Sequence, residues 1–276
     1  MKIRPLLPVS LMLGLLLTLP VARAAEDGAK EPAEQTAART ALEKVYDEAF
    51  EAADREVFDA PALRAKLDAF LAQYPQDASA ASFVGNYFYY VESIDLGQAK
   101  AAWAAFADHA NPKVKAVADK KLALAELIQR PIEMKFTAAD GRAVDVAALR
   151  GKVVLIDFWA TWCGPCIQEI PNVVAAYNQY HAQGFEIVGI SFDKAPDPAK
   201  PNPRHKTAEG VLAFAQEKAM PWPQYYDGLH WNNVFGKQYG IQGIPAMFLL
   251  DKRGLVVSTN ARGPKLAREI QRLLKE

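Results

Sequence analysis

The residues best suited to chemistry are the chain's two cysteines, Cys163 and Cys166, which enclose the dipeptide Gly164-Pro165. An apolar run over residues 153–158 precedes them and predicts a buried strand, and the residues after them have the pattern of a helix. The two sulfurs are therefore expected one turn apart at a strand-to-helix junction. That arrangement suits a disulfide that forms and breaks reversibly.

The two cysteines are expected to differ in role because they stand at different places in the helix. At a helix start, unpaired backbone N–H groups and the positive end of the dipole stabilise an anion, so the pKa of Cys163 is expected to be depressed. Cys163 is the predicted nucleophile. Cys166 lies within the first turn and is expected to be less exposed, so it is predicted to attack the mixed disulfide and release the product.

Two other uses of this cysteine spacing are a zinc half-site and a covalent haem site. A structural zinc site needs a second pair of ligands, but the chain has no further cysteine and its four histidines are scattered. A haem site needs histidine directly after the second cysteine, where this sequence has Ile167. We therefore expect a redox dithiol, with no metal ion and no other cofactor.

The C-terminal half carries the elements that must position the cysteines. Strands alternate there with helices and end in a hairpin, which is typical of an α/β fold with a mixed central sheet and helices on both faces. The expected elements are a hairpin over 132–137 and 142–146, strands over 153–159 and 185–191, helices over about 164–182 and 207–219, an irregular stretch over 222–227, a short helix near 231–239, a hairpin over 246–250 and 255–258, and a last helix from Pro264.

Residues 36–130 are expected to form a small all-helical domain ahead of the α/β domain, which spans 131–276. Apolar residues recur there with the 3.6-residue period of amphipathic helices. The polar stretch 26–35 lacks this period and is expected to be a flexible tether. The aromatic run 87–90 cannot face one side of a helix, so we expect part of it to be exposed or at an interface. Packing and docking onto the second domain is the favoured role, and a partner-binding platform is the alternative.

The first 25 residues have the pattern of a secretory signal peptide: a basic start, an apolar run over 11–19, and a small-residue cleavage site near Ala24. An uncleaved anchor is the alternative, but the run is shorter than the about 20 residues of a membrane span. We expect a periplasmic protein without a stable membrane anchor. Cleavage removes three of the 32 basic residues and leaves 29 against 32 acidic ones, so a net charge of −3 gives nucleic-acid binding no electrostatic support.

A set of segments after residue 130 has a highly specific combined pattern. They are Gly151 to Leu155, Phe158 to Cys166, Glu169, Pro171, Gly243-Ile244-Pro245 and Leu250 to Gly254. On these segments, about half of the chain resembles the thioredoxin superfamily, specifically its extracytoplasmic TlpA/ResA-like branch. The resemblance implies a thioredoxin-like fold and thiol–disulfide oxidoreductase activity. The part before residue 130 contributes nothing to it.

Asp157 lies inside the apolar strand, where burial should raise the pKa of its carboxyl and fit it for proton transfer. A solvated aspartate at a strand edge is the alternative. The resemblance implies that Asp157 carries a proton to or from the buried cysteine, although thioredoxin itself also has a nearby lysine, which Val188-Gly189-Ile190 does not supply. Glu169 is expected to lie on a solvated helix face and receives no catalytic role.

The resemblance also implies a substrate-binding edge. Pro245 stands where this superfamily has a cis-proline facing the cysteines, and a cis bond there would expose the backbone of Ile244 for pairing with a substrate segment. A trans proline at a strand start is the alternative. Trp162 is expected to be a half-exposed lid on the disulfide, and Gly164 and Pro165 are expected to contact substrate.

The dipeptide between the cysteines indicates the direction of electron flow. Gly164-Pro165 is the thioredoxin dipeptide and lacks the histidine of strongly oxidising relatives, which favours a reductant. The resemblance then implies a membrane thiol-transfer electron donor, and protein thiols or disulfides as substrates, such as apocytochrome c. A peroxidase is one alternative, although peroxiredoxins lack the Trp-Cys-Gly-Pro-Cys motif. A redox-regulated binding module that uses the helical domain is the other.

Overall fold

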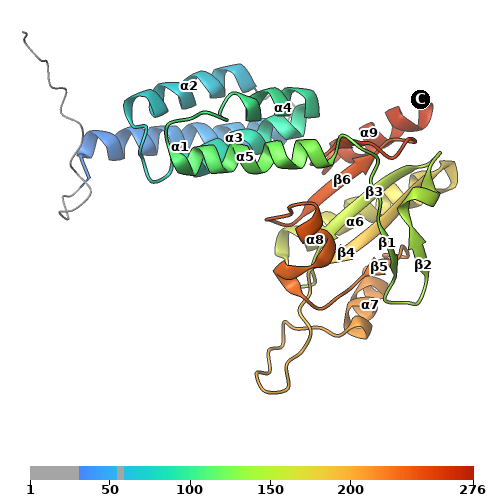
Figure 1. Cartoon of the computed structure of the whole chain (residues 1–276). Helices are drawn as coiled ribbons and strands as arrows, with labels where there is room; N and C mark the ends of the chain where they lie inside the picture. Colours follow the sequence, from blue (N-terminus) through green and yellow to red (C-terminus); the bar gives the residue numbers. More distant parts are fainter. Residues whose placement is uncertain (1–30, 55–58) are drawn as a thin grey trace, which may run out of the picture.

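The computed structural model describes residues 31–54 and 59–276 (Figure 1). The expected signal peptide and residues 26–30 of the expected tether lie outside the described residues. Within these two ranges, none of the helices has both the length and the apolar character needed to cross a membrane.

The N-terminal part is a bundle of helices (Figure 1). Its members are α1 (Ala33–Asp54), α2 (Ala60–Gln73), α3 (Ala80–Ile94), α4 (Leu96–Ala104) and α5 (Pro112–Leu127). Polar side chains cap several of them, because the first N–H groups of a helix have no partner within it. Asp59 accepts a hydrogen bond from the Ala62 N–H, Asp95 from the Gln98 N–H, and Asn111 from the Lys113 N–H.

Helix α1 begins at Ala33, inside the stretch that we expected to be a flexible tether. The expectation was wrong for residues 33–35. Alanine favours helix, and contacts with a distant residue anchor this first turn. Gln35 donates a hydrogen bond to the buried carboxylate of Asp77, and Arg39 forms an ion pair with it.

Aromatic side chains close the bundle. Tyr46 of α1 stacks on Phe83 of α3 with 5.4 Å between ring centroids, and Phe70 of α2 meets the same ring edge-on at 5.4 Å. In the run 87–90, three side chains are buried and Tyr89 is 37% exposed. The prediction that this run cannot all face the core is confirmed.

The C-terminal part is a mixed sheet with strand order β5-β4-β3-β6-β7. Its strands are β3 (Val153–Trp159), β4 (Phe185–Ser191), β5 (Gln224–Tyr225), β6 (Ala246–Leu250) and β7 (Val256–Ser258). Strands β3, β4 and β5 are parallel, whereas β6 is antiparallel to β3 and β7. A separate antiparallel ribbon joins β1 (Lys135–Thr137) and β2 (Ala143–Asp145). Since β3 is the central strand and is buried along its whole length, it provides a rigid base for the cysteines that follow it.

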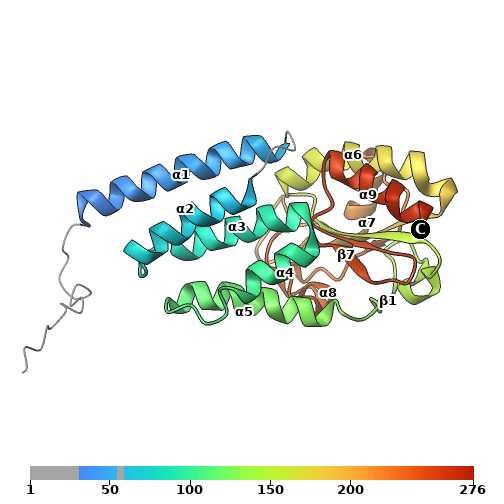
Figure 2. The same ribbon diagram turned by 90° about the horizontal axis from the view of Figure 1, so that it is seen from above.

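Helices flank this sheet. They are α6 (Gly164–Tyr180), α7 (Ala208–Glu217), α8 (Val234–Gln238) and α9 (Pro264–Lys275), with short 3₁₀ turns at Val146–Leu149, His181–Gln183 and His230–Asn232. Helices α6 and α9 pack side by side against the sheet (Figure 2). Helix α8 packs beside Phe192, whose ring contacts Phe158 of β3. Successive residues of a strand point to opposite faces of its sheet, so Asp157 and Phe158 lie on opposite faces. The expected α/β fold with a preceding helical region is confirmed.

One strand was missed. Residues 222–227 were expected to be irregular, but Gln224–Tyr225 pairs with β4 as the edge strand β5. Two residues are too few to show the alternation by which a strand is recognised. Gln224 is also buried, and its side-chain oxygen accepts a hydrogen bond from Trp159 Nε1 at 2.9 Å, so a polar residue replaces the expected apolar one.

The bundle touches the sheet through the end of α3. Glu92 is buried there and pairs with Lys121 of α5, while its carboxylate accepts a hydrogen bond from Thr259 Oγ1 at 3.4 Å. Lys265 Nζ donates to the Glu92 carbonyl oxygen at 3.2 Å. These contacts hold α3 and α5 beside the segment that follows β7.

Candidate active site

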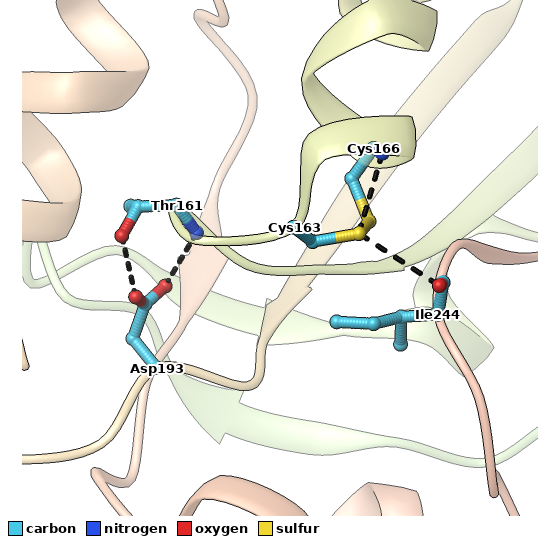
Figure 3. The surroundings of a disulfide bond; sticks show 5 residues. All are labelled: Thr161, Cys163, Cys166, Asp193 and Ile244. Carbon is cyan, nitrogen blue, oxygen red and sulfur yellow. Dashed lines mark hydrogen bonds between the residues drawn. A yellow bond between two sulfur atoms is a disulfide. The ribbon is translucent and has the colours of Figure 1, made fainter. Parts of the chain in front are cut away.

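The two cysteines form a disulfide at the start of α6 (Figure 3). Their Cα atoms are 5.2 Å apart. Cys163 is the residue directly before the helix, and its Sγ accepts a hydrogen bond from the Cys166 N–H at 3.3 Å. A backbone N–H that points at this sulfur would stabilise a thiolate there, because it supplies a donor and the positive end of the helix dipole.

Both cysteines are largely covered by protein. The exposed fraction is 5% for Cys163 and 3% for Cys166. The order agrees with the expectation that Cys166 is the less exposed sulfur, but the difference is small. Cys163 is nearly as buried as Cys166 although it lies just before the helix, so the protein atoms packed around Cys163 limit access to its sulfur.

The Ile244–Pro245 peptide bond is cis, as the family resemblance implied, and it lies beside the disulfide. The Ile244 carbonyl oxygen is 3.7 Å from Cys163 Sγ (Figure 3). Strand β6 follows Pro245 and pairs with β3, so the two halves of the site are carried on neighbouring strands. In the part of the chain that the structure describes, the Ile244 N–H has no hydrogen-bond partner.

Asp157 is buried in β3, with 2% of its surface exposed. Burial raises the pKa of its carboxyl to about 7, the negative charge of Glu169 adds to the increase, and Arg262 opposes it. Its Oδ1 atom has no hydrogen-bond partner among the described residues, so little compensates the charged form for lost water. The site therefore contains a carboxyl that can gain or lose a proton near neutral pH.

Trp162 is half-buried and is supported by aromatic side chains from a distant loop. It stacks on His230 with 5.1 Å between ring centroids, and Trp231 meets it edge-on at 6.1 Å. Burial and the positive charge of Lys194 lower the pKa of His230, which favours the neutral ring. Packing against His230 and Trp231 thus holds Trp162 in place next to the disulfide.

Asp193 is a site residue that sequence reasoning missed. It follows β4, is fully buried, and accepts hydrogen bonds from the Thr161 N–H at 3.0 Å and the Thr161 hydroxyl at 2.6 Å (Figure 3). The Ser191 hydroxyl also donates to it at 2.8 Å. Asp193 therefore fixes the loop that leads into the cysteine motif. An aspartate at the carboxyl end of a strand next to β3 was the available signal.

Glu169 also differs from expectation. It was expected to be a solvated residue, but its Oε1 accepts hydrogen bonds from the Gly263 N–H at 2.8 Å and from Asn172 Nδ2 at 2.6 Å. The contact with Gly263 ties α6 to the start of α9. Gly263 lies 94 positions away from Glu169 along the chain, so no local pattern could reveal this contact.

The structure brings together most of the residues that were predicted to bind substrate. Gly164 and Pro165 are exposed, and Pro165, Ile244 and Pro245 line the same cavity. Trp162 adjoins Cys163 in the chain and packs against His230 instead of lining that cavity. Within residues 31–54 and 59–276, no three His, Cys, Asp or Glu side chains are grouped so that they could hold a metal ion.

Known proteins resemble about half of this chain. The thiol-disulfide oxidoreductase ResA of Bacillus thuringiensis subsp. konkukian is 27% identical over 140 residues, which cover 51% of this chain and 72% of ResA. The thiol:disulfide interchange protein HelX of Rhodobacter capsulatus is 31% identical over 154 residues, or 56% of this chain and 73% of HelX.

Solved structures also match about half of the chain. The crystal structure of the thioredoxin domain of a thiol-disulfide oxidoreductase from Bacteroides vulgatus shares 25% sequence identity and covers 52% of this chain and 95% of that domain, with a TM-score of 0.43. Residues 129–270 match the Redoxin family. With the paired cysteines at the start of α6, this match means that the chain belongs to the Redoxin family and is a thiol–disulfide oxidoreductase.

Proposed function

We propose that the protein reduces or exchanges disulfides of exported proteins in the periplasm, with Cys163 as the attacking group and Cys166 as the resolving one. The observation that carries the proposal is the disulfide itself. Its Cys163 sulfur accepts a hydrogen bond from the Cys166 N–H in the first turn of α6 and lies 3.7 Å from the carbonyl oxygen of Ile244. One sulfur therefore has both the donor that stabilises a thiolate and an adjacent backbone segment that can hold a substrate.

The reaction begins from the reduced protein. The Cys163 thiolate attacks one sulfur of a substrate disulfide, which forms a mixed disulfide and releases the other substrate sulfur as a thiolate that takes up a proton. Cys166 then loses its proton to the carboxylate of Asp157 and attacks Cys163 Sγ. The second substrate sulfur leaves as a thiolate and is protonated. Two electrons have passed to the substrate, and the protein holds the disulfide seen in the structure.

Asp157 suits this proton transfer because of where it lies. A carboxyl with an ordinary pKa would stay ionised at pH 7 and would be a weak base, whereas a pKa of about 7 lets it accept and return a proton within one cycle. Its position in β3, directly before the cysteine motif, keeps it out of bulk water.

The substrate is proposed to bind as an extended segment beside Ile244. The N–H of Ile244, which has no partner among the described residues, and its carbonyl can pair with a substrate backbone whatever its side chains are. Pro245, Gly164, Pro165 and Trp162 then form the surface around the substrate disulfide. The preceding loop is fixed by Asp193, so the surface is largely preformed.

The protein must be reduced again after each cycle. We propose that a membrane thiol-transfer protein donates two electrons from a dithiol, which becomes a disulfide as Cys163 and Cys166 return to thiols. The pattern of residues 1–25 supports export with cleavage near Ala24, and the Gly164-Pro165 dipeptide supports a reducing role. Apocytochrome c is one proposed substrate among exported thiol proteins. The proposed domains are a helical one, predicted over 36–130 and extended to the start of α1 at Ala33, and an α/β one over 131–276.

Trapping tests the assignment of roles. Cys166→Ser should accumulate mixed disulfides with substrate proteins through Cys163, because the resolving thiol is missing, and non-reducing electrophoresis with mass spectrometry would identify them. Cys163→Ser should accumulate far fewer. Equal trapping by both variants would contradict the roles, and consumption of peroxide without reduction of protein disulfides would contradict the function.

A further inference from the structure

A cavity of about 540 Å³ lies between the helical bundle and the disulfide region. One wall comes from α3 and α5, which contribute Tyr89, Lys120 and Leu124 among others. The opposite wall is the active-site surface, with Pro165, Ile244 and Pro245. The substrate-binding edge of the proposed function therefore opens into a groove whose second side is supplied by the helical bundle.

The groove has a basic rim. Lys120 of α5 is exposed, and within the described residues it forms no ion pair. Of the other charged lining groups, Lys121 pairs with Glu92, while Arg262 donates hydrogen bonds to Tyr89 and Asn260. Three cationic groups thus face one carboxylate in the lining, which leaves an excess of positive charge.

The helical wall also presents apolar surface. Val117 and Leu124 of α5 are half-buried, and Tyr89 of α3 keeps 37% of its surface exposed. The ion pair and hydrogen bonds of Glu92 at the end of α3 hold this wall against the segment after β7. A ligand that enters the groove would meet a fixed apolar face with a lysine at its edge.

We propose that the α3–α5 wall selects substrates, by binding an extended polypeptide segment that carries apolar and acidic side chains next to its disulfide. The inference rests on the proposed function, since the segment is the one held by Ile244. An extended chain suits the site because Ile244 offers backbone groups along one side of the groove. An acidic side chain suits it because Lys120 is a cation without a partner in the described part of the chain.

The test uses the reduced full chain and three disulfides. Two are peptides identical except that leucine and glutamate flank the disulfide in one, and leucine and lysine in the other. The third is the small neutral bis(2-hydroxyethyl) disulfide, which is too small to need the groove. Second-order rate constants are measured for wild type, for Lys120→Glu, and for Lys113→Glu, which makes the same charge change on α5 outside the groove lining.

Wild type should reduce the acidic peptide faster than the basic one. Lys120→Glu should slow the acidic peptide about fivefold, speed the basic one, and leave the neutral disulfide unchanged, because an exposed rim charge acts mainly on the encounter of charged partners. High salt should remove the difference. Lys113→Glu should change none of the rates.

Two results would overturn the inference while the proposed function stands. They are equal rates for the two peptides with wild type, and equal effects of Lys120→Glu and Lys113→Glu, each with normal reduction of the neutral disulfide. If the reduced wild-type protein fails to reduce even the neutral disulfide, the proposed function fails, and the inference fails with it.

Discussion

Replacing Asp157 by asparagine removes a buried titratable carboxyl while keeping the size and shape of the side chain. Asp157 lies in the central strand with 2% of its surface exposed. One of its carboxyl oxygens, Oδ1, has no hydrogen-bond partner among the described residues. The substitution therefore changes the free energy of unfolding mainly at pH values where the wild-type carboxyl is ionised in the unfolded chain.

The size of the effect follows from the pKa. Burial raises the pKa of Asp157 from 3.8 to about 7, and each pKa unit corresponds to about 1.4 kcal/mol, so the ionised form is disfavoured in the folded state by about 4 kcal/mol. Between pH 3.8 and about 7, the folded protein keeps a proton that the unfolded chain releases. The contribution of this group to the free energy of unfolding therefore decreases as the pH rises, and levels off above pH 7.

The assay is urea unfolding of the oxidised protein between pH 4 and pH 8.5. The stability of Asp157→Asn relative to wild type should rise by about 4 kcal/mol over this range, because the variant lacks the ionisable group. Asp47→Asn, on the exposed face of α1, is the control and should show no such trend. Disulfide exchange by Asp157→Asn should also be about 10²-fold slower near pH 7, since the amide cannot accept the proton of Cys166.

Two results would refute this reasoning. A stability difference between Asp157→Asn and wild type that stays constant from pH 4 to pH 8.5 would mean that the carboxyl is not desolvated. Exchange rates that match wild type from pH 6 to pH 9 would remove the proposed proton transfer, even if the stability result held.

Two further predictions concern the architecture. Residues 131–276 alone should fold and reduce the neutral disulfide at the rate of the full chain, but should lose the preference for the acidic peptide because the α3–α5 wall is absent; circular dichroism that shows an unfolded fragment would contradict the domain boundary. Asp193→Ala should destabilise the protein by about 2–4 kcal/mol in urea unfolding, because it leaves two half-buried donors of Thr161 and the buried hydroxyl of Ser191 without their acceptor. A loss below about 1 kcal/mol would mean that water replaces the carboxylate.

The chemistry of the site could be read from local sequence. A Cys-x-x-Cys spacing directly after an apolar run places two sulfurs at the start of a helix, because strand and helix periods act over a few residues. The pattern of residues around Asp157 likewise indicated burial, and its raised pKa agrees with that expectation. The cis peptide at Pro245 came from family resemblance. Helical periodicity also marked the bundle, although it placed the start of α1 too late.

Only the tertiary structure decided which distant residues surround the disulfide. Asp193 reaches Thr161, His230 stacks on Trp162, and Gly263 donates to Glu169 because β4 and β6 lie on either side of β3 and α9 packs on α6. The groove beside Ile244 needs α3 and α5 to dock on the segment after β7. Such contacts join residues far apart in the chain, and local periodicity records only which face of an element is apolar, not which other element will cover it.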